Sequence, residues 1–203
     1  MTKTISLLLI IFIAFLQSCN SIDPETKQEI ENAVNYFNNK EYEKALPYFD
    51  KLIEKNHDDY LSWTFKARAL FNLGKEKEGI DAINKAIEIN PDYHKAYAYR
   101  AVMYNQTGLN DMDQIISDIN IALSGDPENI DFIELKAGFL YKAGQYEKAI
   151  NEYNKILKVN PYLYDVIVFH ATTHRKMGHH DVALKGYNRA IGIDSIKSFA
   201  YEE

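Results

Sequence analysis

The 203-residue sequence has one cysteine and one tryptophan, and it contains no glycine-rich or proline-rich stretch. One cysteine excludes disulfides within the chain and zinc sites built from several cysteines. The sequence also has no phosphate-binding glycine loop, no nucleophile elbow and no paired-carboxylate arrangement. No basic run is present, and the formal net charge of −6 disfavours binding to nucleic-acid phosphates. We therefore expect a protein that is not an enzyme, has no cofactor and binds no nucleic acid.

The N-terminus has the pattern of a targeting segment. Lys3 precedes an apolar run from Ile5 to Leu16. As a helix this run would be about 18 Å long, much shorter than a hydrocarbon core of about 30 Å. The run is therefore typical of a signal-peptide core rather than of a membrane-spanning helix.

Leu16-Gln17-Ser18-Cys19 resembles the bacterial lipoprotein signal, with a leucine three residues before a cysteine and a small residue just ahead of it. The resemblance implies a signal peptide over 1–18, lipidation of Cys19 and a lipidated tether over 19–23. It implies a lipid-anchored protein of the bacterial cell envelope, facing the periplasm or the surface. Because Asn20 is not the aspartate that favours inner-membrane retention, the outer membrane is expected. The alternative is an ordinary secretory signal with an incidental cysteine.

Glycines recur at a nearly constant spacing along the rest of the chain: Gly74, Gly108, Gly144 and Gly178. Prolines keep the same period: Pro91, Pro127 and Pro161. A period of this length indicates stacked helical units, none of which buries its apolar face alone. Such an array is usually a surface that holds a partner.

The residues between these markers resemble the tetratricopeptide repeat. In the clearest repeat, Trp63 opens the first helix, Ala67 follows four residues later, Gly74 lies in the turn and Pro91 closes the second helix. The resemblance implies an all-α fold, a right-handed superhelical solenoid of about five helix-turn-helix repeats over 24–197. The predicted repeats are 26–59, 60–93, 94–129, 130–163 and 164–197, followed by a short stub helix over 198–203.

Particular residues carry the packing of these repeats. Asp23 and Pro24 predict the N-cap and first turn of the opening helix. Ala67 and its equivalents, Ala101, Ala137 and Ala171, allow close helix contact. The turn glycines tolerate left-handed backbone, although the first repeat has no such glycine. Leu109 and Asn110 are extra residues that we expect to enlarge one turn.

A basic side chain recurs beside these alanines: Lys66, Arg100, Lys136 and His170. One interpretation is a positive surface for an acidic partner. We favour ion pairing inside the array, for instance of Arg100 with Asp118 and of Lys136 with Glu152.

Histidines concentrate in the last repeat at His170, His174, His179 and His180. His170 and His174 are four residues apart and would share a helix face, so they are weak candidates for a metal site. We favour a structural role, because Ala171 occupies the position that a zinc-protease motif gives to glutamate.

The first helices of a tetratricopeptide array line a concave surface, and the resemblance assigns the partner-binding groove to them. The predicted groove residues are Ile30, Val34, Phe37, Leu61, Thr64, Arg68, Phe71, Lys95, Val102, Asn105, Glu134, Tyr141 and Arg175, and the resemblance also places Asp131, Val168 and Thr172 on this face. Some family members grip a peptide carboxylate with lysine and asparagine in the first repeat. Here Ile30 and Val34 occupy those positions, which favours an apolar peptide or helix in the first half of the groove. Alternatively, Ile30, Val34 and Phe37 pack against the N-terminal tether.

The sequence therefore predicts a membrane-anchored adaptor or scaffold that binds a protein or peptide through its groove. One alternative is a structural or assembly factor that self-associates, as a homo-oligomer, through the C-terminal helix with Leu184 and Ile191. A minor alternative is a metal-binding protein that uses the histidines of the last repeat.

Overall fold

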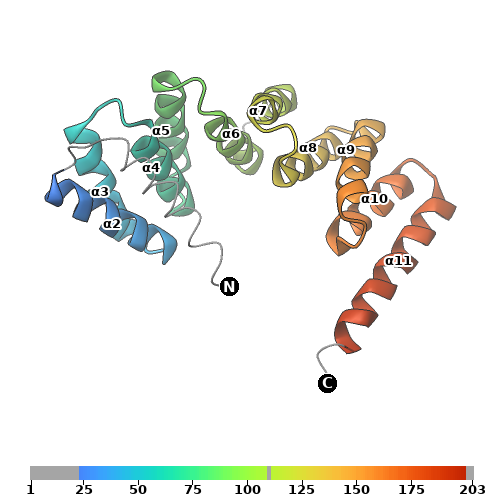
Figure 1. The fold of residues 1–203 in the computed structure, drawn as a ribbon. Coiled ribbons are helices and arrows are strands. Elements are labelled where there is room, and N and C mark those ends of the chain that lie inside the picture. The colour runs from blue at the N-terminus through green and yellow to red at the C-terminus, as the bar shows by residue number, and fades with distance from the viewer. Residues whose placement is uncertain (1–22, 109–110, 200–203) are drawn as a thin grey trace. The chain divides into compact units, whose positions relative to one another are not determined.

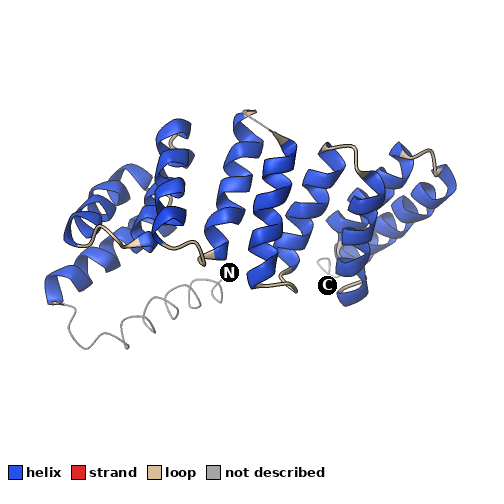
Figure 2. Cartoon of the chain, turned by 90° about the horizontal axis from the view of Figure 1, so that it is seen from above, coloured by secondary structure: helices blue, strands red, loops and turns tan. Residues whose placement is uncertain are grey.

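The computed structural model describes residues 23–108 and 111–199, and its regular elements over these ranges are helices. Figure 1 shows them in chain order, and the secondary-structure view of Figure 2 shows helices joined by short loops. The helices are α2 (Pro24–Asn38), α3 (Tyr42–Lys55), α4 (Tyr60–Asn72), α5 (Glu76–Ile89), α6 (His94–Thr107), α7 (Met112–Gly125), α8 (Ile130–Lys142), α9 (Tyr146–Val159), α10 (Tyr164–Lys176) and α11 (His180–Phe199).

The helices form consecutive pairs, as a solenoid of helix-turn-helix repeats requires. The first helices of repeats two to five begin at Tyr60, His94, Ile130 and Tyr164. The chain divides into two compact units, one up to Ile89 with α2 to α5 and one from Asn90 with α6 to α11. The predicted all-α repeat fold is confirmed for the described ranges.

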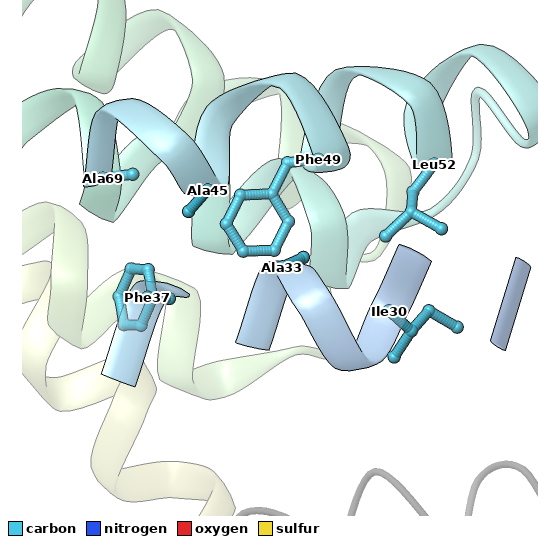
Figure 3. Close-up of a cluster of buried hydrophobic side chains, with 7 residues drawn as sticks. All are labelled: Ile30, Ala33, Phe37, Ala45, Phe49, Leu52 and Ala69. Atoms are coloured by element: carbon cyan, nitrogen blue, oxygen red, sulfur yellow. The ribbon is translucent and has the colours of Figure 1, made fainter. Parts of the chain in front are cut away.

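The first unit has an aromatic core between α2, α3 and α4. Figure 3 shows Phe37 and Ile30 on α2 facing Phe49 and Leu52 on α3. The Phe37 ring lies edge-on to Phe49 and to Phe65, with ring centroids 6.2 Å and 5.1 Å apart. These contacts place α4 of the second repeat against both helices of the first.

The second unit has two connected cores. Ile115, Ile119 and Phe139 belong to one buried cluster between α6, α7 and α8. Ile133, Tyr153 and Val166 belong to another between α8, α9 and α10. Because Phe139 and Ile133 both lie on α8, this helix contributes to both cores and is held from both sides.

Small side chains lie where helices cross. Ala67, Ala101, Ala137 and Ala171 are all completely buried, as predicted. Close helix approach of this kind leaves no room for a larger side chain without strain.

Caps and left-handed turns define the helix ends. The Asp23 carboxylate accepts a hydrogen bond from the Thr26 amide at 2.9 Å, which confirms the predicted N-cap of α2. The turn glycines have φ between +67° and +80°, as predicted for left-handed C-terminal turns: Gly74, Gly108, Gly144 and Gly178. In the first repeat Lys40 takes this conformation, with φ of 61°.

Ion pairs occupy the basic positions beside the buried alanines. Arg100 pairs with Asp118 at 2.7 Å, and Lys136 pairs with Glu152 at 3.1 Å, which confirms the favoured interpretation. Lys66 instead contacts Asp50 of the preceding repeat at 2.7 Å. These three cations are structural ties between helices.

The C-terminal helix differs from the prediction. We expected a separate stub helix from Ser198, but α11 continues unbroken from His180 to Phe199. The second helices of repeats two to four, α5, α7 and α9, end two residues before a proline, whereas the sequence Asp194-Ser195 at the corresponding point of the last repeat provides no such stop. Within the described ranges, no helix has the length and apolar character needed to cross a membrane.

Several predictions fall outside the described residues. These are the signal peptide over 1–18, the lipidated Cys19 and most of its tether, the enlarged turn at Leu109 and Asn110, and the end of the stub at 200–203.

Candidate functional site

An open cavity of about 730 Å³ lies in the second unit, against the first helices of its three repeats. Its lining comes from α6, α8, α9 and α10: Asn105, Asp131, Glu134, Leu135, Gly138, Phe139, Tyr141, Lys142, Tyr153, Val168, Phe169 and Thr172. The volume is in the range of ligand-binding clefts, and most of the lining side chains are apolar or aromatic. This cavity is the candidate functional site.

Gly138 creates the open space at the middle of α8. A Cβ added at Gly138 would meet nothing within 4 Å. The repeat period makes this position equivalent to Arg68 in repeat two and to Val102 in repeat three. In repeat two the Arg68 guanidinium lies over the Phe37 and Phe65 rings, 4.8 Å and 5.5 Å from their centroids. Repeat four has no side chain at this position, so the surface remains hollow.

Two other helical glycines of the second unit, Gly125 and Gly186, have a packing reason that Gly138 lacks, whereas Gly192 on α11 also faces open space. A Cβ at Gly186 would lie 2.7 Å from the Ala171 Cβ, and one at Gly125 would lie 2.5 Å from the His94 ring. Glycine inside a helix costs about 1 kcal/mol relative to alanine. The neighbouring packing therefore does not require glycine at Gly138, and the open cavity is its structural consequence.

Two aromatic side chains form one wall of the cavity. The Tyr153 ring stacks on Phe169, with centroids 6.4 Å apart. Tyr153 is buried, and this burial together with the nearby Glu134 carboxylate raises the pKa of its hydroxyl to about 12. Phe169, by contrast, is 50% exposed. A large apolar residue that lines a cavity and remains half in water is a ready contact for an apolar ligand.

Carboxylates gather at the end of the cavity where α8 begins. Partial burial of Glu134 and the negative charges of Asp131 and Asp165 raise the pKa of the Glu134 carboxyl. None of these three carboxylates has an ion-pair partner among residues 23–108 and 111–193. The acids at this end of the cavity therefore repel one another, and no cation among these residues pairs with them.

The opposite end of the cavity carries a cation. Lys142, the last residue of α8, donates a hydrogen bond to the Asn105 side chain of α6 at 2.9 Å. Asp131 and Lys142 are eleven residues apart, which corresponds to about 16 Å along a helix. The cavity is therefore acidic at one end, basic at the other and apolar between them.

The predicted groove residues of the second unit divide into two groups. Asn105, Glu134 and Tyr141 come together around the cavity. Lys95, Val102 and Arg175 are not part of its lining. Lys95 and Arg175 are exposed, and Val102 packs half-buried against a core cluster.

The predicted groove residues of the first unit need correction. Ile30, Phe37 and Thr64 are 9%, 8% and 1% exposed, so they belong to the core and do not line a surface. Figure 3 shows Ile30 and Phe37 in the aromatic cluster. Residues of α3 and α4 cover the face of α2 on which Ile30 and Phe37 lie, and Thr64 is buried on α4 with its hydroxyl donating to the Tyr60 carbonyl. The remaining predicted residues of this unit are half-buried: Val34, Leu61, Arg68 and Phe71.

The histidines of the last repeat form a chain of ring contacts. His170 and His174 have centroids 4.6 Å apart, and the Nδ1 atoms of His174 and His179 are 3.3 Å apart. Burial lowers the pKa of His170 to about 4, with help from His174 and Arg189. In the parts of the chain that the structure describes, no three potential metal ligands are grouped to hold an ion.

Sequence reasoning missed half of the cavity lining: Leu135, Gly138, Phe139, Lys142, Tyr153 and Phe169. Gly138 could have been found, because it stands at the groove position where other repeats carry a side chain. Tyr153 lies on a second helix, a class of helix that the groove prediction did not use. Phe139 and Phe169 lie beside the predicted face, and the repeat pattern alone does not place them in the cavity lining.

Comparison with known proteins identifies the repeats. Two models described as tetratricopeptide repeat match residues 30–94 and 132–162. A similar curated protein is Hsp70-Hsp90 organizing protein 3 of Arabidopsis thaliana, 24% identical over 120 residues. That match covers 59% of this chain and 21% of the relative, so the chain spans about a fifth of the relative's length.

Solved structures show the same fold. MamA residues 41 to the end, from Desulfovibrio magneticus RS-1, has a TM-score of 0.78 at 14% identity and covers 86% of this chain and 98% of its own. YrrB has a TM-score of 0.69 at 16% identity and covers 81% of this chain and 84% of its own. YrrB is described as a tetratricopeptide repeat protein with an unusual peptide-binding site. The solved structures show the fold, and the two tetratricopeptide repeat models that match residues 30–94 and 132–162 show that the chain belongs to the tetratricopeptide repeat family.

Proposed function

We propose that the protein is a membrane-anchored adaptor that binds a protein partner in the cavity above Gly138. The observation that carries this proposal is an open, mainly apolar cavity of about 730 Å³ on the first helices of the second unit. Apolar clefts of this size with a few polar groups at the edge are typical binding sites. Tetratricopeptide proteins generally act as adaptors or scaffolds, and YrrB is described as binding peptide.

The binding part of the proposal is tested by filling the cavity without disturbing the fold. Because a Cβ at Gly138 meets open space, Gly138→Leu projects a side chain into the cavity, whereas Gly138→Ala adds one methyl group. Affinity capture from detergent-solubilised membranes would compare both variants with the wild type. A partner retained by wild type and Gly138→Ala but lost by Gly138→Leu supports the proposal. Equal capture by all three contradicts it.

The anchoring part of the proposal rests on the lipoprotein-like segment that ends at Cys19. Two or three acyl chains would hold the protein stably at a membrane, at about 0.8 kcal/mol per buried methylene. To test this, the protein is expressed in a bacterium that is fed a clickable fatty acid, which labels any protein that becomes acylated. Wild type and Ser21→Ala should carry the label in the membrane fraction, and Cys19→Ser should not. Labelling of Cys19→Ser, or an unlabelled wild type, would contradict lipidation at Cys19.

A second candidate function is self-association through α11. Leu184 is 61% exposed and Ile191 is 62% exposed, and the two are seven residues apart on one helix face. Sedimentation velocity should then give a mass that rises with concentration, and Leu184→Asp should abolish the rise. A concentration-independent monomer mass would exclude this function.

A further inference from the structure

The charges around the cavity limit which peptide segments of a partner protein could bind there. The apolar centre lies at Gly138, where Phe169 and Tyr153 provide an aromatic wall. Glu134 is one helical turn from Gly138, and Asp131 is two turns away. These separations correspond to about 6 Å and about 10 Å along the helix axis.

The acids at this end of the cavity are suited to a cation from outside the chain. Asp131, Glu134 and Asp165 have no ion-pair partner among the described residues up to 193. Their mutual repulsion is relieved when a positive charge approaches, and a half-buried carboxylate such as Glu134 gains more from a cation than an exposed one does. An acidic ligand would meet the same charges at a cost.

We propose that the cavity binds a peptide segment of a partner protein that carries a large apolar side chain over Gly138 and a lysine or arginine two to three residues away, against Glu134 and Asp131. An extended peptide advances about 3.3 Å per residue, so a separation of two to three residues matches the distance from Gly138 to the acids. This inference rests on the proposed adaptor function, since it names the ligand of the same cavity.

Gly138 then sets the size of the apolar side chain that the ligand can place in the cavity. Arg68 and Val102 fill the equivalent positions of repeats two and three with side chains. A glycine at the same register of repeat four leaves room for a side chain supplied by the ligand, and the buried apolar area provides the main attraction.

The test uses three fluorescein-labelled peptides of eleven residues, built from glycine and serine around the central position. The first peptide has phenylalanine at the centre and lysine two residues to each side. The second replaces both lysines with glutamate, and the third replaces the phenylalanine with glycine. Binding is measured by fluorescence anisotropy with the wild-type protein and with four variants: Gly138→Leu, Gly138→Ala, the double variant Asp131→Asn/Glu134→Gln, and Glu147→Gln as an exposed acid outside the cavity lining.

The lysine peptide should bind the wild type at least about tenfold more tightly than either other peptide. Gly138→Leu should weaken its binding about tenfold or more, while Gly138→Ala and Glu147→Gln should change it less than about threefold. The double variant should lose the preference for lysine over glutamate and should also lose most of its salt dependence. Circular dichroism of each variant, with the same helical signal as the wild type, shows that the fold is intact.

Failure of this inference can be separated from failure of the adaptor function. If the glutamate peptide binds as well as the lysine peptide, and Gly138→Leu abolishes both, the cavity is a binding site but the inferred ligand chemistry is wrong. If the lysine peptide shows no binding while Gly138→Leu still loses a native partner, the inference is overturned and the adaptor function stands. If Gly138→Leu changes neither peptide binding nor partner capture, both are overturned.

Discussion

Arg100 on α6 donates two hydrogen bonds to the Asp118 carboxylate on α7, from Nε at 2.8 Å and from Nη2 at 2.7 Å. Asp118 is completely buried, and the Gln114 amide donates a third hydrogen bond to it at 3.1 Å. The pair locks the two helices of repeat three together in the second unit. A buried charge held in this way becomes costly when its partner is removed.

Arg100→Met should therefore lower the free energy of unfolding by about 3 kcal/mol, because Asp118 stays buried without its cation. Lys136→Met is the matched control in the same unit. Its partner Glu152 keeps a second cation, Lys155 at 2.6 Å, so the control should lose about 1 kcal/mol or less. Urea unfolding followed by circular dichroism measures both. Equal losses for the two variants would show that the Arg100 pair has no special role.

Replacing Lys40 with glycine should stabilise the first unit. Lys40 has φ of 61°, a conformation that costs a residue with a Cβ about 1 kcal/mol relative to glycine. We expect Lys40→Gly to raise the free energy of unfolding of the first unit by up to about 1 kcal/mol. The reverse change at an equivalent turn, Gly74→Ala, should lower it by a similar amount. Thermal melts of the two variants should shift in opposite directions, and a shift in the same direction would contradict this explanation.

His170 should make the second unit sensitive to acid. Its pKa is about 4 in the folded protein and near 6.5 when unfolded, so above pH 6.5 it is neutral in both states and has no effect. As pH falls from 6.5 to 4, the unfolded chain binds a proton that the folded chain does not. The full shift corresponds to about 3 kcal/mol, and solvent screening at this partly exposed side chain reduces the expected fall in the free energy of unfolding to about 2 kcal/mol. Below pH 4 both states are protonated and the loss is complete.

The measurement is urea unfolding at several pH values for wild type, His170→Leu and the exposed control His180→Gln. The wild type and His180→Gln should weaken together below pH 6.5, whereas His170→Leu should lose about 2 kcal/mol less over the same range. If the curve of His170→Leu runs parallel to that of the wild type, His170 is not the group responsible.

Gly138→Ala should stabilise the second unit by up to about 1 kcal/mol, because alanine is the better helix former and its methyl group meets open space. Gly186→Ala is the contrasting variant, since its Cβ would lie 2.7 Å from the Ala171 Cβ. It should destabilise the same unit by about 1 to 3 kcal/mol through overpacking. Chemical unfolding distinguishes the two, and destabilisation by Gly138→Ala would mean that the cavity is closed in solution.

Much of the fold could be predicted from residues whose role is local. A turn glycine such as Gly144 and a crossing residue such as Ala137 act within a few residues of themselves, so their spacing predicts helix pairs directly. The pairing of Arg100 with Asp118 was predictable because both lie at fixed positions of one repeat. The continuous α11 was not predicted, because the second helix of the last repeat was expected to end at the same position as in the other repeats.

The site was harder to predict, since it depends on which helix covers which face. Phe37 has the spacing of a groove residue, but Phe65 of the next repeat packs against it and moves it into the core. Gly138 shows the opposite case, in which a missing side chain makes the site. Sequence patterns report the side chains that are present, whereas a cavity depends on the space that their neighbours leave.

Photo-crosslinking from the wall of the cavity tests the central claim most directly. Phe169 is half exposed and lines the cavity, so the extra benzoyl group of p-benzoylphenylalanine at this position has open space to occupy. Tyr162, 69% exposed and outside the cavity lining, is the control position. Irradiation of cells should give a defined adduct from position 169 that is absent from position 162 and is lost when Gly138→Leu is added. No adduct at position 169, or an adduct that survives Gly138→Leu, would contradict a partner seated in the cavity.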